Sequence, residues 1–109
     1  MSARVLYVVR IKISTGVEQA WNQWHNGEHI PMVLALPGFL SVRKFRSMNS
    51  TEKEAEYIVC YELRNIAAYE NYVKSDEGEA LRQQYLDAFG TKTKIERWTW
   101  VECFSLTKK

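Results

Sequence analysis

Both histidines of the chain lie in one short stretch, residues 21–38, together with two of its four tryptophans and both of its prolines. Imidazole titrates near neutral pH, so a histidine in a semi-dry cavity can accept or donate a proton. Indole rings can form the walls of a pocket for a flat, apolar molecule. Titratable groups, aromatic rings and a helix breaker in so short a stretch predict a binding pocket. If the protein is a catalyst, we expect the reaction there.

His29 is the main candidate for proton transfer, and it lies two residues before Pro31. His25 lies four residues earlier, so the two imidazoles can be neighbours on one helix face. We predict His29 as the general acid or base and His25 as a second catalytic group that polarises an oxygen. In the structural alternative, His29 only donates to a carbonyl that the proline leaves without a partner.

The segment 25–29 (His-Asn-Gly-Glu-His) also matches the H-x-x-E-H pattern of one zinc-protease class. A catalytic zinc needs three protein ligands, and the sequence indicates no third one. Gly27 and Pro31 weaken the helix that would hold two ligands in place. We therefore predict no metal here.

Four residues are candidates for substrate binding: Trp21, Trp24, Tyr61 and Arg43. The tryptophans are three residues apart, share a helix face and could form pocket walls. Tyr61 could direct a hydroxyl into the same cavity, and Arg43 could bind a carboxylate or enolate oxygen. Ordinary core packing is the alternative for the aromatic residues, and a solvated or interfacial ion pair is the alternative for Arg43.

Composition narrows the class of protein. A chain of 109 residues with 46% hydrophobic residues is expected to form one domain over residues 1–109. The net charge of +2 comes from scattered basic residues, which argues against nucleic-acid binding. The apolar run Val5–Val9 is too short to span a membrane. Cys60 and Cys103 lack metal or redox spacing and are predicted to be buried free thiols, so we expect a cytoplasmic protein. No phosphate loop or nucleotide fingerprint is present, and no cofactor is predicted.

Periodicity predicts the elements that position these residues. Alternating apolar residues predict a strand over residues 4–13, and Thr15 could cap a helix that begins near Val17. Pro31 should kink or end that helix near Ile30, before a short helical piece over residues 32–36. The second helix should begin near residue 65, pause at Ser75 and continue to Leu86. Asp76 and Glu79 have capping-box spacing at its restart. The remaining strands are predicted over residues 39–47, 55–63 and 95–106.

The resulting order, β-α-β-β-α-β, is the ferredoxin-like arrangement of α+β proteins, an antiparallel sheet with both helices on one face. In a monomer the other face would meet water and should be polar. Here apolar residues occur on both faces of the strands. A second copy of the chain is therefore expected to cover the open face, and we predict a homodimer. The apolar residues in question are Leu6, Val8, Leu40, Val42, Ile58 and Cys60.

The chain resembles the dimeric α+β barrel superfamily, and most of all its EthD-like members. The resemblance is carried by Trp-x-x-Trp at positions 21 and 24, Glu-His-Ile-Pro at 28–31 and Leu-Pro-Gly-Phe at 36–39. It implies two sheets that close a barrel across a dimer, with a pocket between sheet and helices in each subunit. Members include cofactor-independent monooxygenases, muconolactone isomerases, and polyketide cyclases and dehydratases. In such proteins the histidine before the proline often lines the pocket, which implies that role for His29.

We predict a small cofactor-independent enzyme that acts by proton transfer, as an isomerase, dehydratase or cyclase. Its substrate would be a hydrophobic, aromatic or polyketide-like small molecule. One alternative is a cofactor-independent monooxygenase of quinol-like substrates. Another is a non-catalytic dimer that binds a small apolar ligand. A protein-interaction module is a further alternative, and it requires that Trp21 and Trp24 are exposed.

Overall fold

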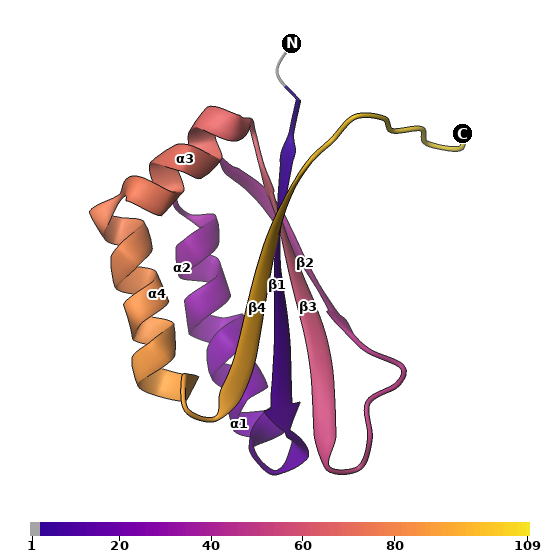
Figure 1. Ribbon diagram of the computed structural model, residues 1–109, viewed down its shortest axis with the longest axis vertical. Helices are drawn as coiled ribbons and strands as arrows, with labels where there is room; N and C mark the ends of the chain where they lie inside the picture. Colours follow the sequence, from indigo (N-terminus) through magenta and orange to yellow (C-terminus); the bar gives the residue numbers. More distant parts are fainter. Residues whose placement is uncertain (1–2) are drawn as a thin grey trace.

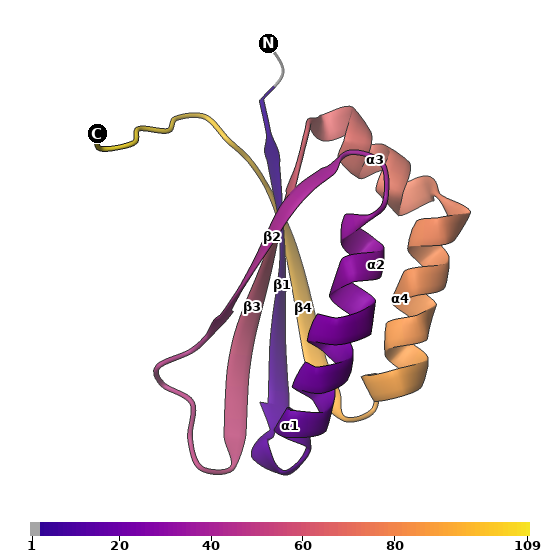
Figure 2. The ribbon, with the colours of Figure 1, turned by 180° about the vertical axis from the view of Figure 1, so that it is seen from behind.

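The computed structural model describes residues 3–109 and consists of one four-stranded antiparallel sheet with the helices packed on one face (Figures 1 and 2). The strand order in the sheet is β2-β3-β1-β4. This architecture confirms the predicted ferredoxin-like fold. The strands are β1 (Val5–Ser14), β2 (Phe39–Arg46), β3 (Glu54–Leu63) and β4 (Thr93–Val101).

The central strands owe their place to the alternation of apolar residues. On β1, Val5, Tyr7, Ile11 and Ile13 are buried beneath the helices. Strand β1 pairs with β3 on one side and β4 on the other. Strand residues that are β-branched or aromatic pack well on such a half-buried pleated surface. The core therefore lies between this face of the sheet and the helices.

The first helical segment runs without a break past its proline. Helix α1 (Thr15–Trp24) continues through a π-helical turn, η1 (His25–His29), into α2 (Ile30–Leu34). The Ile30 N–H donates to the His25 carbonyl five residues back, and Pro31 has no N–H to donate. The predicted disturbance at Pro31 is thus a change of helical pitch that begins at His25. The N-cap is Ser14, whose side chain accepts from the Gly16 N–H, instead of the predicted Thr15.

The second helical segment pauses at Ser75, as predicted. It forms α3 (Ile66–Lys74) and α4 (Asp76–Phe89). Ser75 itself caps α4, because its hydroxyl accepts from the Gly78 N–H at 3.0 Å. The capping box predicted from Asp76 and Glu79 was therefore wrong, because the cap lies one residue earlier, at Ser75. A hydroxyl that precedes the first helical turn is well placed to satisfy a free N–H group.

The last strand is shorter than predicted, because β1 begins at Val5 and Val5 lies opposite Val101. Residues 102–109 have no strand to pair with and project away from the sheet (Figures 1 and 2). Cys103 lies in this segment and is exposed, so its predicted burial was wrong. Cys60 is half-buried on β3, and both thiols are free.

The face of the sheet opposite the helices, called the outer face below, carries large apolar side chains that are exposed in the isolated chain. They are Leu6, Phe45, Ile58, Trp98 and Trp100. Apolar residues are thus present on both faces, as the sequence indicated. Within residues 3–109, no helix combines the length and hydropathy needed to cross a bilayer.

Candidate functional site

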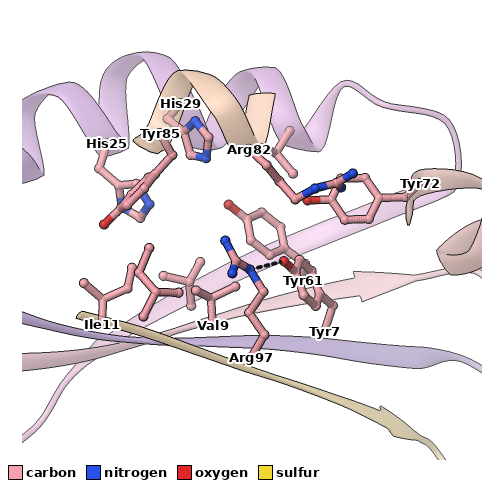
Figure 3. A pocket seen from close by; sticks show the side chains of 13 residues that line it. Tyr7, Val9, Ile11, His25, His29, Tyr61, Tyr72, Arg82, Tyr85 and Arg97 are labelled. Carbon is pink, nitrogen blue, oxygen red and sulfur yellow. Dashed lines mark hydrogen bonds between the residues drawn. The ribbon is translucent and has the colours of Figure 1, made fainter. Parts of the chain in front are cut away.

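A cavity of about 30 Å³ lies between the helices and the inner face of the sheet, with room for about one water molecule. Its lining consists of two histidines, two arginines, four tyrosines and five aliphatic residues. Figure 3 shows His25 and His29 above the cavity and Tyr7, Val9, Ile11 and Arg97 rising from the strands below. Both predicted catalytic residues therefore face the same cavity.

His29 is the last residue of η1 and is 8% exposed. Its Nδ1 lies 3.4 Å from Oε1 of Gln84 on α4. An amide oxygen only accepts, so this contact places the ring hydrogen on Nδ1 and leaves the Nε2 lone pair unprotonated. Burial lowers the pKa of His29, the Gln84 contact partly offsets this, and the charge of Arg97 lowers it further. His29 is thus a neutral imidazole that can accept a proton.

His25 is 2% exposed and has the opposite hydrogen-bonding pattern. Its Nδ1 lies 2.9 Å from Nζ of Lys44. An ammonium group only donates, so Nδ1 is the acceptor and Nε2 carries the ring hydrogen. Nε2 of His25 has no hydrogen-bond partner, whereas every side-chain nitrogen and oxygen of residues 3–109 that is closed to solvent has one. The Nε2–H is therefore accessible, and it faces the cavity that His25 lines. Burial, followed by the charge of Lys44, lowers the pKa of His25 to about 2.

The two imidazoles are held by aromatic stacking. Their ring centroids are 5.6 Å apart and the rings are nearly parallel, at 15°. Trp21 stacks on His25 at 4.6 Å, and Trp24 stacks on His29 at 5.1 Å. The tryptophans thus lie behind the histidines and do not line the cavity.

Trp21 is fully buried, and its Nε1–H donates to the Tyr85 hydroxyl at 3.0 Å. Trp24 is half-buried against the core. A protein-interaction module would need both rings at the surface, so the structure contradicts that alternative.

Lys44 is a site residue that sequence reasoning missed. Its ammonium donates to Asn22 Oδ1 at 2.7 Å and Asn26 Oδ1 at 2.8 Å, in addition to His25, which uses all three of its hydrogens. It also lies 3.9 Å from the centre of a Trp21 ring. Burial lowers the pKa of Lys44 to about 8, so it remains largely charged at neutral pH.

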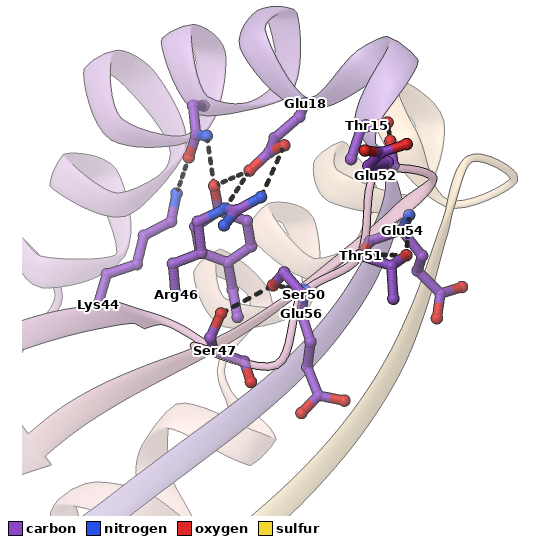
Figure 4. Close-up of polar contacts among 12 residues, drawn as sticks. Thr15, Glu18, Lys44, Arg46, Ser47, Ser50, Thr51, Glu52, Glu54 and Glu56 are labelled. Carbon is purple, nitrogen blue, oxygen red and sulfur yellow. Dashed lines mark hydrogen bonds and ion pairs between the residues drawn. The ribbon is translucent and has the colours of Figure 1, made fainter.

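A second polar layer supports Lys44 from behind. Figure 4 shows Lys44 and Arg46 rising from β2 towards α1, which carries Glu18. Arg46 Nε donates to Glu18 at 2.7 Å, and the Tyr57 hydroxyl donates to the same carboxylate. Asn22 then links Tyr57 to Lys44, because its Nδ2 donates to the Tyr57 hydroxyl at 2.9 Å. These bonds lower the pKa of Glu18, which stays ionised.

Of the two remaining candidates for substrate binding, Tyr61 lines the cavity and Arg43 does not. Tyr61 lines the cavity with its hydroxyl directed towards the helices (Figure 3), and burial raises its pKa, so it is a neutral donor. Arg43 is on the outer face, 5.0 Å from the ring of Phe45. A β-bulge between Phe39 and Ser41 shifts the alternation of β2, so Lys44 points inward in place of Arg43.

Other lining residues were also missed because their segments read as ordinary core. Tyr72, Arg82 and Tyr85 reach the cavity from α3 and α4, a segment in which no site residue was predicted. Arg97 faces inward from β4 and donates its Nε–H to the Tyr7 hydroxyl at 3.0 Å. The Tyr85 hydroxyl lies 3.1 Å from the Thr93 hydroxyl at the start of β4, which ties α4 to that strand beside the cavity.

The side chains of residues 25–29, which match the zinc-protease pattern, do not point to a common site. Glu28 is exposed, whereas His25 and His29 are buried. Across residues 3–109, no three histidine, cysteine, aspartate or glutamate side chains are grouped as metal ligands would be.

Comparison with known proteins places the chain among small ferredoxin-like proteins. The model of a family described as a domain of unknown function, DUF4286, matches residues 4–100. No curated protein matches the sequence. An EthD family protein from Bacillus halodurans C-125 has a similar structure, with a TM-score of 0.65 and 13% identity over 86% of this chain and 96% of that one.

Two further solved structures share the fold. SnoaB from Streptomyces nogalater, described as a cofactor-independent oxygenase, has a TM-score of 0.69 and 12% identity, covering 98% of this chain and 100% of its own. A dimeric ferredoxin-like protein from an uncultured marine organism has a TM-score of 0.59 and 15% identity, covering 96% and 100%. At these identities the likeness concerns the fold, and it confirms the resemblance that the sequence indicated.

Proposed function

This chain belongs to the DUF4286 family, and because the description of that family names no activity, we propose a function from the cavity. The protein is a small cofactor-independent enzyme that transfers a proton on a hydrophobic, aromatic or polyketide-like molecule. One observation carries the proposal: two neutral imidazoles face one cavity, and their hydrogen bonds give them opposite roles.

In this reaction His29 is the general base, and its free Nε2 removes a proton from a carbon next to a carbonyl group. The carbonyl oxygen gains negative charge as that proton leaves. The Nε2–H of His25 and the hydroxyl of Tyr61 donate to this oxygen. Return of the proton to another carbon gives an isomerisation, and loss of a neighbouring hydroxyl as water gives a dehydration.

The aliphatic lining supports a flat apolar substrate. Val9, Ile11 and Val59 form the floor on the sheet, and Val33 lies on the helical side. The cavity must widen when a substrate enters, since about 30 Å³ holds little more than a water molecule. Arg82 is half-buried and Arg97 is exposed, so both lie on the solvent side of the cavity, where a substrate would enter.

The test uses a probe that needs no knowledge of the natural substrate. We expect the protein to accelerate the exchange of the acidic CH₂ hydrogens of 2-tetralone for deuterium, followed by proton NMR. His29→Gln should lower this rate by about 10²–10⁴-fold. The control is Glu28→Gln, one residue away and exposed, which should keep the full rate. An unchanged rate in His29→Gln would remove His29 from the mechanism.

A cofactor-independent monooxygenase of quinol-like substrates is the second candidate. Its support is the shared fold with SnoaB and the same base, which could deprotonate a quinol. Oxygen uptake with 1,4-dihydroxynaphthalene, above the uncatalysed rate and lost in His29→Gln, would favour this candidate over proton transfer alone. In a non-catalytic ligand carrier, the same substitution would lower affinity or stability and abolish no reaction.

The proposal includes a homodimer formed through the outer face. The support is the row of exposed apolar side chains on that face and the fold shared with a protein described as dimeric. Burying such a row is favourable in proportion to the apolar area removed from water.

A further inference from the structure

Two guanidinium groups line the cavity, and no carboxylate of the described residues 3–109 forms an ion pair with either. They are Arg82 from α4 and Arg97 from β4. No aspartate or glutamate is present among the residues that line the cavity. Three other arginines of the chain do pair with glutamates, namely Arg4, Arg10 and Arg46. Arg43 and Arg64 are also without an ion pair in the described residues, but they lie outside the cavity, so Arg82 and Arg97 are the arginines that bring uncompensated charge to it.

Each of the two arginines is held in place by neutral groups. Arg97 donates its Nε–H to the Tyr7 hydroxyl at 3.0 Å, which leaves the N–H groups of its two terminal nitrogens available. Arg82 donates from Nη2 to the Val73 carbonyl at 3.1 Å and lies 4.8 Å from the centre of the Tyr72 ring. Figure 3 shows Arg97 extending from the sheet towards the helical side, where Arg82 lies beside Tyr72. Neutral anchors fix the direction of a guanidinium without cancelling its charge.

The electrostatics of the cavity favour an anion. Its charged groups are two guanidiniums, and both of its imidazoles are neutral because their pKa values are lowered by burial. The charge of Arg97 also contributes to the lowered pKa of His29. A carboxylate there would gain charge-assisted and planar, two-pronged hydrogen bonds from arginine. A cationic ligand would be repelled.

We propose that the mouth of this cavity is a carboxylate-binding site formed by Arg97 and Arg82. The substrate is then an aromatic or polyketide-like carboxylic acid whose anionic end lies between the arginines. Its apolar body extends over Val9 and Ile95 towards His29. This inference rests on the proposed function and gives the class of its substrate.

The test compares benzoate with benzamide, which have nearly the same shape and differ in charge. Binding is followed through the ring proton signals of His25 and His29, the only histidines of the chain. We expect saturable binding of benzoate, at least about 10-fold tighter than that of benzamide. Arg97→Met and Arg82→Met should each weaken benzoate binding by about 10-fold and leave benzamide binding nearly unchanged. Arg64→Met removes an exposed arginine outside the cavity lining and should have no effect.

Three results would each overturn the inference: no saturable benzoate binding, equal affinity for the two probes, or benzoate affinity that both arginine variants retain. Arg97→Lys keeps the charge and loses the planar fork, so its affinity should be intermediate. Rising salt should weaken the binding of benzoate alone, which tests the charge in the unaltered protein. Because binding needs no turnover, saturable benzoate binding by unaltered protein that exchanges no 2-tetralone hydrogens would refute proton transfer and leave the arginine site intact.

Discussion

Lys44 determines which ring nitrogen of His25 faces the cavity as a donor. It approaches Nδ1 at 2.9 Å with the last of its three hydrogens, and the other two are bound by Asn22 and Asn26. A lysine so held cannot turn away without leaving both amide oxygens unpaired. Lys44 is thus a positioning residue, and it acts on the substrate only through His25.

Replacing Lys44 with Met tests this role. The variant should lose the fixed Nε2–H form of His25, and the pKa of His25 should rise above about 2 because a nearby positive charge is gone. Nitrogen-15 NMR of the ring distinguishes the two neutral forms directly. Lys53→Met, which removes an exposed lysine from the β2–β3 turn, should leave the ring signals unchanged. A wild-type His25 protonated on Nδ1 would contradict the assignment.

The buried histidines also make the stability of the fold depend on pH. The folded protein keeps His25 neutral, whereas the unfolded chain binds a proton there below pH 6.5. Because the unfolded state then binds more protons, the free energy of unfolding should fall as pH decreases from 6.5 towards 2. Urea denaturation at several pH values measures the slope. His25→Gln cannot titrate and should reduce it, and an unchanged slope would show that other groups control acid stability.

The π turn is the element that aligns the two histidines. Pro31 has no N–H, and the Ile30 N–H reaches back to the His25 carbonyl, so one extra residue fits into the turn. His25 and His29 then stand as nearly parallel rings on the side facing the sheet. The same turn contains Gly27, where an added Cβ would meet no atom within 4 Å.

Gly27→Ala should therefore stabilise the protein by about 1 kcal/mol, since alanine loses less backbone entropy in a helix than glycine. Gly38→Ala should instead destabilise the protein. Gly38 has a φ of +88°, and its Cβ would lie 2.5 Å from the Cβ of Ala68. The urea midpoints of the two variants, compared with that of the wild type, measure both changes in stability. A destabilised Gly27→Ala would mean that the π turn requires glycine.

Periodicity predicted the elements well, because strands and helices are encoded by local repeats. The pause at Ser75 and the strand pattern of β1 followed from turn chemistry and alternation. The bulge near Leu40 and the π turn each insert one residue, and an inserted residue changes which side chains face inward. Because of the bulge, Lys44 points inward and the predicted site residue Arg43 lies on the outer face. The end of β4 at Val101 depends on where β1 begins. This pairing joins distant parts of the chain, so no local sequence pattern predicts it.

At the scale of the whole molecule, the outer face combines ion pairs, Arg4–Glu62 among them, with a patch of exposed apolar side chains. Arg10 pairs with Glu56 and Glu96 at one end. The other end presents exposed apolar side chains, among them Trp98 and Trp100. In a symmetric pair of chains, the same patch meets itself, so an apolar patch of this kind suits a two-fold interface.

A charge placed in this apolar patch should separate the subunits. Trp98→Glu is expected to sediment as a monomer at micromolar concentration, where the wild type sediments as a dimer, because a carboxylate would be buried unpaired in the interface. Met48→Glu, at a fully exposed residue in the β2–β3 turn, is the control. Circular dichroism of both variants checks that the chain is folded. A monomeric wild type would rule out the proposed assembly.

The distribution of the four indole rings has a practical consequence for optical work. Trp21 and Trp24 stack on the imidazoles, and Trp98 and Trp100 lie on the opposite side of the sheet. Intrinsic fluorescence of the unlabelled chain therefore has two sources. Emission of the inner pair should respond to a ligand that binds beside the imidazoles. The outer pair lies on the face proposed as the dimer interface, so a change of its emission on dilution would follow dissociation of the dimer.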